Sequence, residues 1–472
     1  MLVTLAGCVD ESVPTDPSSP RPEARAVAGD LSIADALRSS ETQTALRANV
    51  RGLSIDLAAL EDHEIRPEHV TGVVSDEGLD EDEPDAPVRA LITDARRRLA
   101  GPQARVIERE IALMPGTRLP FDPSFKLPPK PYLHVGNFGS AFHAAIKNSV
   151  AGYALRITQK GQTIYTLQWN WAQTPADASL GWNMNRRMHV ASVSKLVTAI
   201  AMVRLLQENG IDYDAKIINY LPTYWQKGPN IGNIKFRHLL THTSGFSTNS
   251  SSSDFAFMKA RVAAGVSGIG SSDYENMNFG LCRILIAIIN GNINKNAQFP
   301  FINDLLWDAI TTSAYAQYVN QKVFAPAGVS GPKLDKPASP ARAYPFPALG
   351  NGWNSGDLTS MAGGAAWHMS INEVLRVMHA FRRAGTIVPP SKAQDALDAR
   401  FGVDRIINTS AGKLYDKNGL WRDGIQRTEQ SVAVFLPDGL DIVVFVNSPI
   451  GVSGASLRNL VRDLYIASIV QP

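Results

Sequence analysis

The sequence predicts an α+β fold in which an antiparallel sheet is flanked by helices and joined to a helical subdomain. Alternating apolar residues form two strand-like runs in 152–169 around a Lys-Gly pair, and two more in 430–449 around an Asp-Gly pair. Short turns of this kind between alternating runs are typical of β-hairpins. Helical periodicity dominates the chain between them. Because strands from both ends enclose a helical middle, we expect one sheet built from both ends of this region, with the helical middle packed on it.

Composition narrows the functional classes. The 472 residues exceed one typical domain, and 46 basic against 44 acidic residues give a net charge of +2. A net charge this close to zero creates no strong positive electrostatic field that would attract nucleic acid, so we expect no nucleic-acid partner. The two cysteines, Cys8 and Cys282, are far apart, which argues against a disulfide framework or a zinc site. No apolar run reaches the length of a membrane-spanning helix.

The first residues resemble a bacterial lipobox. Leu5-Ala6-Gly7-Cys8 follows a short apolar run and precedes a Pro/Ser-rich stretch. The resemblance implies acylation of Cys8 and a lipid-anchored protein of the cell envelope or periplasm. The basic segment and longer apolar segment of a complete signal are missing, so either the true start lies upstream or the match is chance. We assign residues 1–29 to this signal remnant and a flexible tether.

Three further regions follow. Residues 30–115 show helical spacing around an acidic loop and predict a small helical region to which the sequence assigns no function. Residues 116–134 are rich in proline, which sustains neither helix nor central strand, and form a predicted linker. Residues 135–472 form the predicted main domain, which begins with a helix over 139–149 and ends with an amphipathic helix over 454–470.

Ser-x-x-Lys is the first candidate catalytic pattern. It occurs three times, at Ser192/Lys195, Ser330/Lys333 and Ser410/Lys413. The second copy contains glycine and proline, and the third lies in a polar loop with glycine, so neither favours a helical turn. Only the first opens a helix, with an apolar stripe behind it and an Asn-Gly stop after it.

The helical spacing gives this first pair a possible chemistry. Side chains three residues apart share one helix face, with Cβ atoms about 5–6 Å apart, so the Lys195 ammonium can reach the Ser192 hydroxyl. A serine needs a neighbouring base to become a nucleophile, and a desolvated lysine can be that base. The alternative from these residues alone is that Ser192 caps the helix and Lys195 is solvated.

Further motifs resemble those of the serine β-lactamase and penicillin-binding-protein superfamily, and especially its class C β-lactamase, D-Ala-D-Ala carboxypeptidase and family VIII carboxylesterase branch. Residues 187–222 and 234–246 carry the resemblance, together with Tyr274-Glu275-Asn276 as Tyr-x-Asn and Lys417-Asn418-Gly419 as Lys-x-Gly. The Gly-Gly segment in 361–378 adds to it. The resemblance covers about residues 135–472 and implies a β-lactamase/transpeptidase-like fold.

The resemblance also implies catalytic roles. Ser192 would be the nucleophile, and Lys195 would help to deprotonate it. Tyr274 would act as acid and base, held between Lys195 and Lys417. No metal and no cofactor are implied.

Substrate-binding roles follow in the same way. Asn276 would orient the acyl substituent. The backbone N–H of Leu420 would form an oxyanion hole with that of the nucleophile, while Gly419 lets the strand approach. Because the Lys417 ammonium could bind a carboxylate, substrates that carry a carboxylate are compatible with the resemblance. Asn418 departs from the usual threonine and removes a hydroxyl, which argues against β-lactamase activity more than against acyl transfer.

We therefore expect a serine hydrolase that forms an acyl-enzyme with a small ester or amide, as a carboxylesterase or a D-Ala-D-Ala peptidase does. The alternatives are a class C-like β-lactamase and a non-catalytic cell-envelope binding protein with the same fold. The sequence contains neither G-x-S-x-G nor H-E-x-x-H. His238 and His242 have a spacing that can serve a metal, but we interpret them as structural. Trp353 and Trp421 either line a pocket or are packed.

Overall fold

The computed structural model describes residues 32–53, 55, 57, 60, 85–114, 130–248 and 250–471. Four predicted features lie wholly or largely outside these residues: Cys8, the 1–29 tether, the acidic loop and most of the proline-rich linker.

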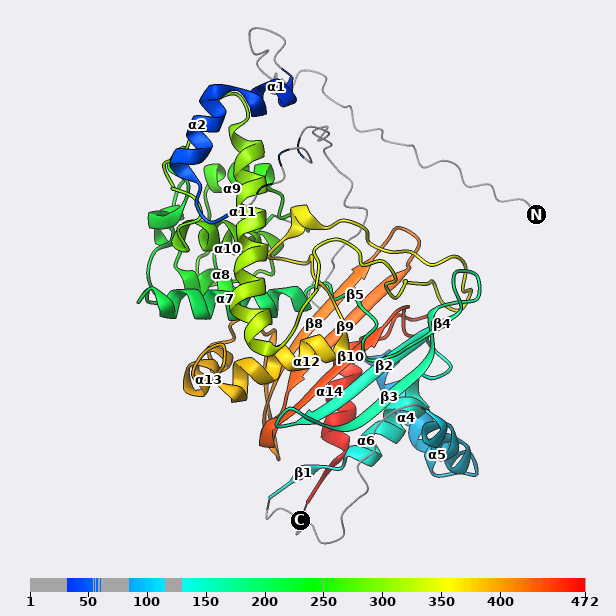
Figure 1. The fold of residues 1–472 in the computed structure, drawn as a ribbon. Coiled ribbons are helices and arrows are strands. Elements are labelled where there is room, and N and C mark those ends of the chain that lie inside the picture. The colour runs from blue at the N-terminus through cyan, green and yellow to red at the C-terminus, as the bar shows by residue number, and fades with distance from the viewer. Residues whose placement is uncertain are drawn as a thin grey trace, which may run out of the picture.

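Along the described chain, runs of strands near both ends of the main domain enclose a run of helices from α7 to α11 (Figure 1). The strands are β1 (Tyr132–Leu133), β2 (Gly152–Gln159), β3 (Gln162–Gln173), β4 (Leu180–Gly181), β5 (Met188–His189), β6 (His368–Met369), β7 (Arg405–Thr409), β8 (Gly412–Arg422), β9 (Thr428–Phe435), β10 (Leu440–Val446) and β11 (Ile469–Val470). The α-helices are α1 (Ile33–Arg38), α2 (Ser40–Asn49), α4 (Ala86–Leu99), α5 (Gln103–Leu113), α6 (Val135–Ile146), α7 (Val193–Glu208), α8 (Phe236–Leu240), α9 (Phe255–Ala264), α10 (Asn276–Ile289), α11 (Asn303–Val319), α12 (Ile371–His379), α13 (Pro390–Asp398) and α14 (Leu457–Ala467).

The main sheet is antiparallel and has seven strands within the described residues, in the order β4-β3-β2-β10-β9-β8-β7. At the centre of the sheet, β2 pairs with β10. β2 comes from the start of the main domain, and β10 comes from the end of that domain. The predicted fold class is therefore confirmed. Among the described helices, none is both long enough and apolar enough to cross a bilayer.

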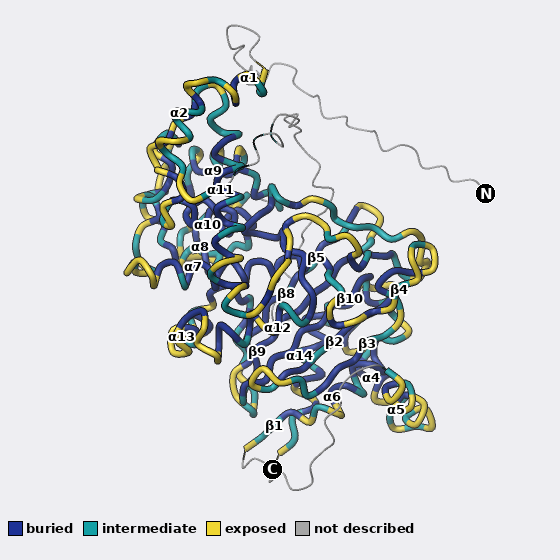
Figure 2. Tube along the Cα trace, in the orientation of Figure 1, coloured by how far each residue is buried: buried dark blue, intermediate teal, exposed yellow. Residues whose placement is uncertain are grey.

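Helices cover both faces of the sheet because the central strands are apolar on both sides. Along β10, Ile442, Val444 and Val446 face one core, while Val443 and Phe445 face the other. This is the period of two expected for a strand. The first core also contains residues of α4, α5, α6 and α14, and the second contains the helical subdomain. Figure 2 shows the sheet as a largely buried layer between them.

Both predicted hairpins form, and their turns explain why. Lys160 and Gly161 have φ of 50° and 82°, and Asp438 and Gly439 have φ of 61° and 74°. Left-handed conformations at both central residues match the twist of the flanking strands. The predicted terminal helix is also present as α14, which Ser456 caps by accepting a hydrogen bond from Asn459 N–H.

The described helices of the 30–115 region form two pairs, α1 with α2 and α4 with α5, and the two pairs pack against different cores. The Leu37 side chain of α1 is buried in the core of the helical subdomain, and Asn49 O accepts a hydrogen bond from Asn294 N–H at 3.0 Å. In contrast, Ile92 of α4 and Ile107 of α5 are buried in the sheet-side core. Helical periodicity identifies a buried face but not the core that covers it. The predicted domain boundaries stay a prediction.

Candidate active site

Ser192 lies directly before α7, where the chain turns from β5 into the helix. Ala191 adopts a left-handed φ of 46°, and Ser194 N–H donates to Ala191 O at 3.0 Å, which closes the turn. The Ser192 side chain is fully buried and makes no capping hydrogen bond to the helix. Its Oγ instead accepts a hydrogen bond from Lys195 Nζ at 2.9 Å. The structure therefore does not support Ser192 as a simple helix cap.

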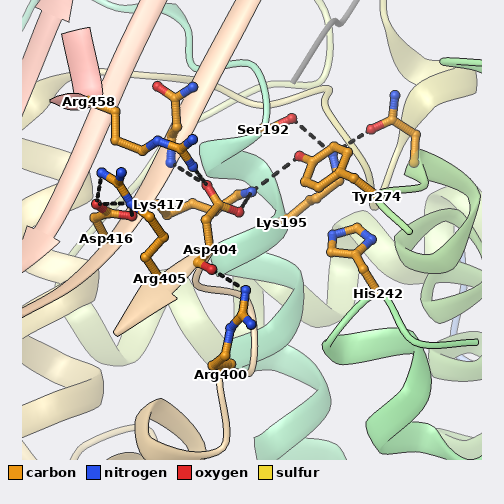
Figure 3. A network of polar contacts seen from close by, with 12 residues as sticks. Ser192, Lys195, His242, Tyr274, Arg400, Asp404, Arg405, Asp416, Lys417 and Arg458 are labelled. Atoms are coloured by element: carbon orange, nitrogen blue, oxygen red, sulfur yellow. Dashed lines mark hydrogen bonds and ion pairs between the residues drawn. The ribbon is translucent and has the colours of Figure 1, made fainter. Parts of the chain in front are cut away.

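Lys195 is also fully buried, which rules out the solvated alternative for this lysine. Besides Ser192 Oγ, its Nζ donates to Asn276 Oδ1 at 2.5 Å and to Gly364 O at 3.0 Å. Gly364 belongs to the Gly-Gly segment noted in the sequence. These three oxygen acceptors fix the ammonium beside the serine hydroxyl. Figure 3 shows Lys195 next to Ser192.

Tyr274 lies between two lysines. The ammonium of Lys195 is 4.8 Å from the centre of the ring and that of Lys417 is 4.9 Å. The Tyr274 hydroxyl accepts a hydrogen bond from Lys417 Nζ at 3.2 Å. The structure thus brings Ser192, Lys195, Tyr274 and Lys417 together from three separate parts of the chain, as Figure 3 shows.

His242 is a member of this site that the sequence did not single out for it. Its ring stacks on the Tyr274 ring, with centroids 4.2 Å apart and an interplanar angle of 27°. Burial, and then the charges of Lys417 and Lys195, hold the pKa of His242 well below its usual value. Its Nδ1 accepts a hydrogen bond from Glu275 N–H at 3.1 Å. A neutral imidazole therefore supports the tyrosine ring.

The four-residue spacing of His238 and His242, which could serve a metal, does not form part of a metal site in the described residues. His238 Nδ1 accepts a hydrogen bond from Lys235 N–H, at the start of α8. Across the part of the chain that the structure describes, no group of three or more His, Cys, Asp or Glu residues is arranged to hold a metal. The structural interpretation of the two histidines agrees with these contacts.

Asp404 is the second member that sequence reasoning missed. Its Oδ1 lies 2.5 Å from Lys417 Nζ, and its Oδ2 accepts a hydrogen bond from Asn418 N–H at 2.9 Å. Arg458 Nη1 approaches the same Oδ2 at 3.5 Å. Burial alone would raise the pKa of Asp404, but Lys417 and Arg458 lower it to about 2. The Asp404 carboxylate is therefore ionised, and its negative charge offsets the positive charge of the Lys417 ammonium.

The edge of β8 lies against the nucleophile turn at Gly419. A Cβ at this position would be 2.4 Å from Val190 O and 3.2 Å from Ser192 N, so only glycine allows this approach. Asn418 N–H points away from β9, toward Asp404. Because backbone N–H groups alternate along a strand, Leu420 N–H lies on the same edge. This geometry is compatible with the predicted oxyanion hole.

The implied role of Asn276, to orient the acyl substituent, stays a prediction, and its amide makes two contacts within the protein. Its Oδ1 accepts from Lys195, and its Nδ2 donates to Ser251 O at 2.7 Å. Both ends of the amide are therefore engaged within the protein, and the Oδ1 end holds the lysine. Glu275 turns away from the site, because its carboxylate accepts a hydrogen bond from Thr248 Oγ1 at 2.6 Å.

The other sequence candidates lie outside this arrangement. Lys413 is the second residue of β8 and forms an exposed ion pair with Asp398 at 2.6 Å. Lys333 lies outside the helices, in an isolated bridge with His368. Trp421 is buried edge-on against His189 with ring centres 5.4 Å apart, and so it is packed in the core. Trp353 is partly buried against the core of the helical subdomain.

Comparisons with known proteins agree with this fold. A family model described as Beta-lactamase matches residues 138–465. A curated protein from Mycobacterium tuberculosis (strain ATCC 25618 / H37Rv), named Esterase/beta-lactamase LipL, is 29% identical over 136 residues. That match covers 27% of this chain and spans only 31% of the length of LipL.

Solved structures with similar folds share little sequence with the chain. FmtA from Staphylococcus aureus has a TM-score of 0.53 at 13% identity, with 77% of this chain and 94% of that chain covered. A Beta-Lactamase/D-Alanine Carboxypeptidase from Pseudomonas syringae has a TM-score of 0.52 at 14% identity, with coverage of 72% and 98%. A penicillin-binding protein homologue from Pyrococcus abyssi reaches 0.53 at 16% identity, with coverage of 70% and 76%. Since the family model covers more than half of the chain and the solved neighbours share its fold, the protein belongs to the beta-lactamase family.

Proposed function

We propose that this chain is a serine hydrolase that forms an acyl-enzyme on Ser192, with small esters or amides as substrates. The observation that carries the proposal is the buried contact of 2.9 Å between Ser192 Oγ and Lys195 Nζ, beside a tyrosine that lies between two lysines. Burial of a lysine ammonium costs free energy even when it is hydrogen-bonded, and Lys195 is fully buried next to the serine hydroxyl. Buried ionisable side chains that contact a possible nucleophile are candidates for catalytic residues.

In the proposed acylation, Ser192 Oγ attacks the carbonyl carbon of the substrate and its proton passes to the Lys195–Tyr274 pair. The carbonyl oxygen becomes an oxyanion, which the backbone N–H groups of Ser192 and Leu420 stabilise. The bond to the leaving group breaks as Tyr274 returns the proton to it. In deacylation, water attacks the ester formed on Ser192, and the same pair takes the water proton and returns it to Oγ.

The family and the name of one relative support ester or amide chemistry. LipL is named as both an esterase and a β-lactamase, and a solved neighbour is named as a β-lactamase and D-alanine carboxypeptidase. Asn418 lacks the hydroxyl usual at its position in the resemblance, which favours esters over β-lactams. The two alternative functions, a β-lactamase and an inert binding protein, are distinguished by the experiment below.

Pre-steady-state kinetics with a p-nitrophenyl ester test the proposal. We expect a burst of about one equivalent of p-nitrophenol per chain when deacylation is slow, and loss of turnover in Ser192→Ala. Nitrocefin and a D-Ala-D-Ala peptide, measured beside the ester, separate the three hydrolase classes. Absence of any turnover or acylation with all three substrates would identify the inert binding protein instead.

A further inference from the structure

A buried carboxylate occupies the position next to the lysine of the third motif. Lys417 is only 1% exposed and the Asp404 side chain 9%, and their charged atoms are 2.5 Å apart. The other carboxylate oxygen of Asp404 is bound by the backbone N–H of Asn418. Asp404 therefore bridges the side chain of one motif residue and the backbone of the next.

This bridge changes what Lys417 can offer a substrate. A substrate carboxylate within hydrogen-bond reach of Lys417 Nζ would lie a few ångströms from the Asp404 carboxylate, which has the same charge. In a site that is largely shielded from water, repulsion between like charges is only weakly screened. Lys417 is thus positioned to contact the Tyr274 hydroxyl, at 3.2 Å, rather than to attract an anion.

Arg458 and Arg405 do not reverse this conclusion. Arg458 contacts Asp404 through the oxygen that does not contact Lys417. The contacts thus run in the order Arg458, Asp404, Lys417, Tyr274, with the carboxylate between the arginine and the active site (Figure 3). Arg405 forms an ion pair with Asp416, in which Arg405 Nη2 lies 2.6 Å from Asp416 Oδ2.

We propose that Asp404 is a specificity-determining residue, which makes the leaving-group side of the site select neutral substrates over those that carry a carboxylate at that position. The inference rests on the proposed hydrolase function and narrows it. The favoured substrates are uncharged esters, and the disfavoured ones are peptides ending in D-Ala and β-lactams, whose carboxylates lie on the leaving-group side. Asp404 acts through Lys417 and by direct repulsion, and it has no part in bond breaking.

A matched pair of thioesters tests this selection. The phenylacetylglycyl thioester of mercaptoacetate and its methyl ester share the acyl group and the bond that breaks, and differ only in the leaving-group carboxylate. We expect the wild-type protein to have the higher kcat/KM for the methyl ester. In Asp404→Asn the amide oxygen can still accept from Asn418 N–H, while the negative charge is gone. The ratio of the two kcat/KM values should then move toward the carboxylate substrate by about tenfold or more, since each charge-assisted contact is worth roughly that factor.

Asp398→Asn is the control, because Asp398 pairs with a lysine of the same strand, Lys413, in an exposed position. Its ratio should equal that of the wild type. A wild-type preference for the carboxylate substrate overturns the inference without any variant, as does an unchanged ratio in a folded Asp404→Asn protein. Failure to hydrolyse either thioester, together with an unacylated Ser192, would instead contradict the proposed function on which the inference rests.

Discussion

The Tyr274 hydroxyl receives a hydrogen bond from Lys417, and its ring is held by His242 and two ammonium groups. Most of these contacts involve the ring rather than the oxygen. A substitution that keeps the ring and removes the oxygen therefore separates packing from proton transfer.

Tyr274→Phe is expected to lower ester turnover by about 10²–10⁴, the usual worth of a positioned acid or base. The free energy of unfolding should fall by no more than about 1.5 kcal/mol, the value of one hydrogen bond. Steady-state kinetics and urea denaturation measure the two effects. Lys333→Ala and Lys413→Ala, in the other two Ser-x-x-Lys matches, should leave turnover near wild type. Loss of turnover in these two variants but not in Tyr274→Phe would place the active site elsewhere.

Asp404 gives a prediction for acid stability. Its pKa is about 2 in the folded protein, below the ordinary value of 3.8, so its contribution to stability is present above pH 3.8 and is lost as the pH falls toward 2. The loss corresponds to about 2 kcal/mol. The difference in unfolding free energy between wild type and Asp404→Asn should therefore narrow between pH 4 and pH 2. Urea denaturation at a series of pH values measures it, and a constant difference would contradict the assignment.

At the scale of elements, the site depends on how closely β8 approaches the start of α7. Gly419 makes this approach possible, and the sequence indicated a need for glycine there. The sequence could not indicate Asp404 or His242. Asp404 lies just before β7, and its partners Lys417 and Arg458 are on β8 and α14, so only the folded sheet brings them together. His242 belongs to a loop whose stacking partner is 32 residues later in the chain.

Gly419→Ala is expected to abolish most of the activity, because its Cβ would lie 2.4 Å from Val190 O and force the strand away from Ser192. Gly424→Ala is the matched control, since a Cβ at that position meets no atom within 4 Å. Burst kinetics with the p-nitrophenyl ester compare the two variants. Equal activity in both would show that the close approach of β8 is not needed.

Across the whole molecule, sequence patterns predicted the structures that form between residues adjacent in the chain. Each hairpin was predictable because its strands and turn are adjacent in the chain, as at Lys160 and Gly161. The distribution of the 30–115 helices over two cores was not predictable, because an apolar helix face does not identify its partner. The sheet-side helices α4 and α5 nevertheless bury several apolar side chains against the main domain.

Ile107→Ala in α5 is therefore expected to lower the free energy of unfolding by about 2–5 kcal/mol, because the side chain is buried in the sheet-side core. Val106→Ala changes the neighbouring residue, which is 54% exposed, and should cost less than about 0.5 kcal/mol. Urea denaturation of the full chain measures both. Equal effects would mean that α5 does not pack as described.

Covalent labelling shows directly whether Ser192 is an activated nucleophile. The protein is incubated with a fluorophosphonate, which phosphonylates an activated serine, and intact and peptide mass spectra then locate the adduct. We expect one adduct per chain, on Ser192, that is absent in Ser192→Ala and strongly reduced in Lys195→Ala. An adduct on Ser330 or Ser410, or ester hydrolysis with Ser192 unlabelled and unaffected by its replacement, would contradict it.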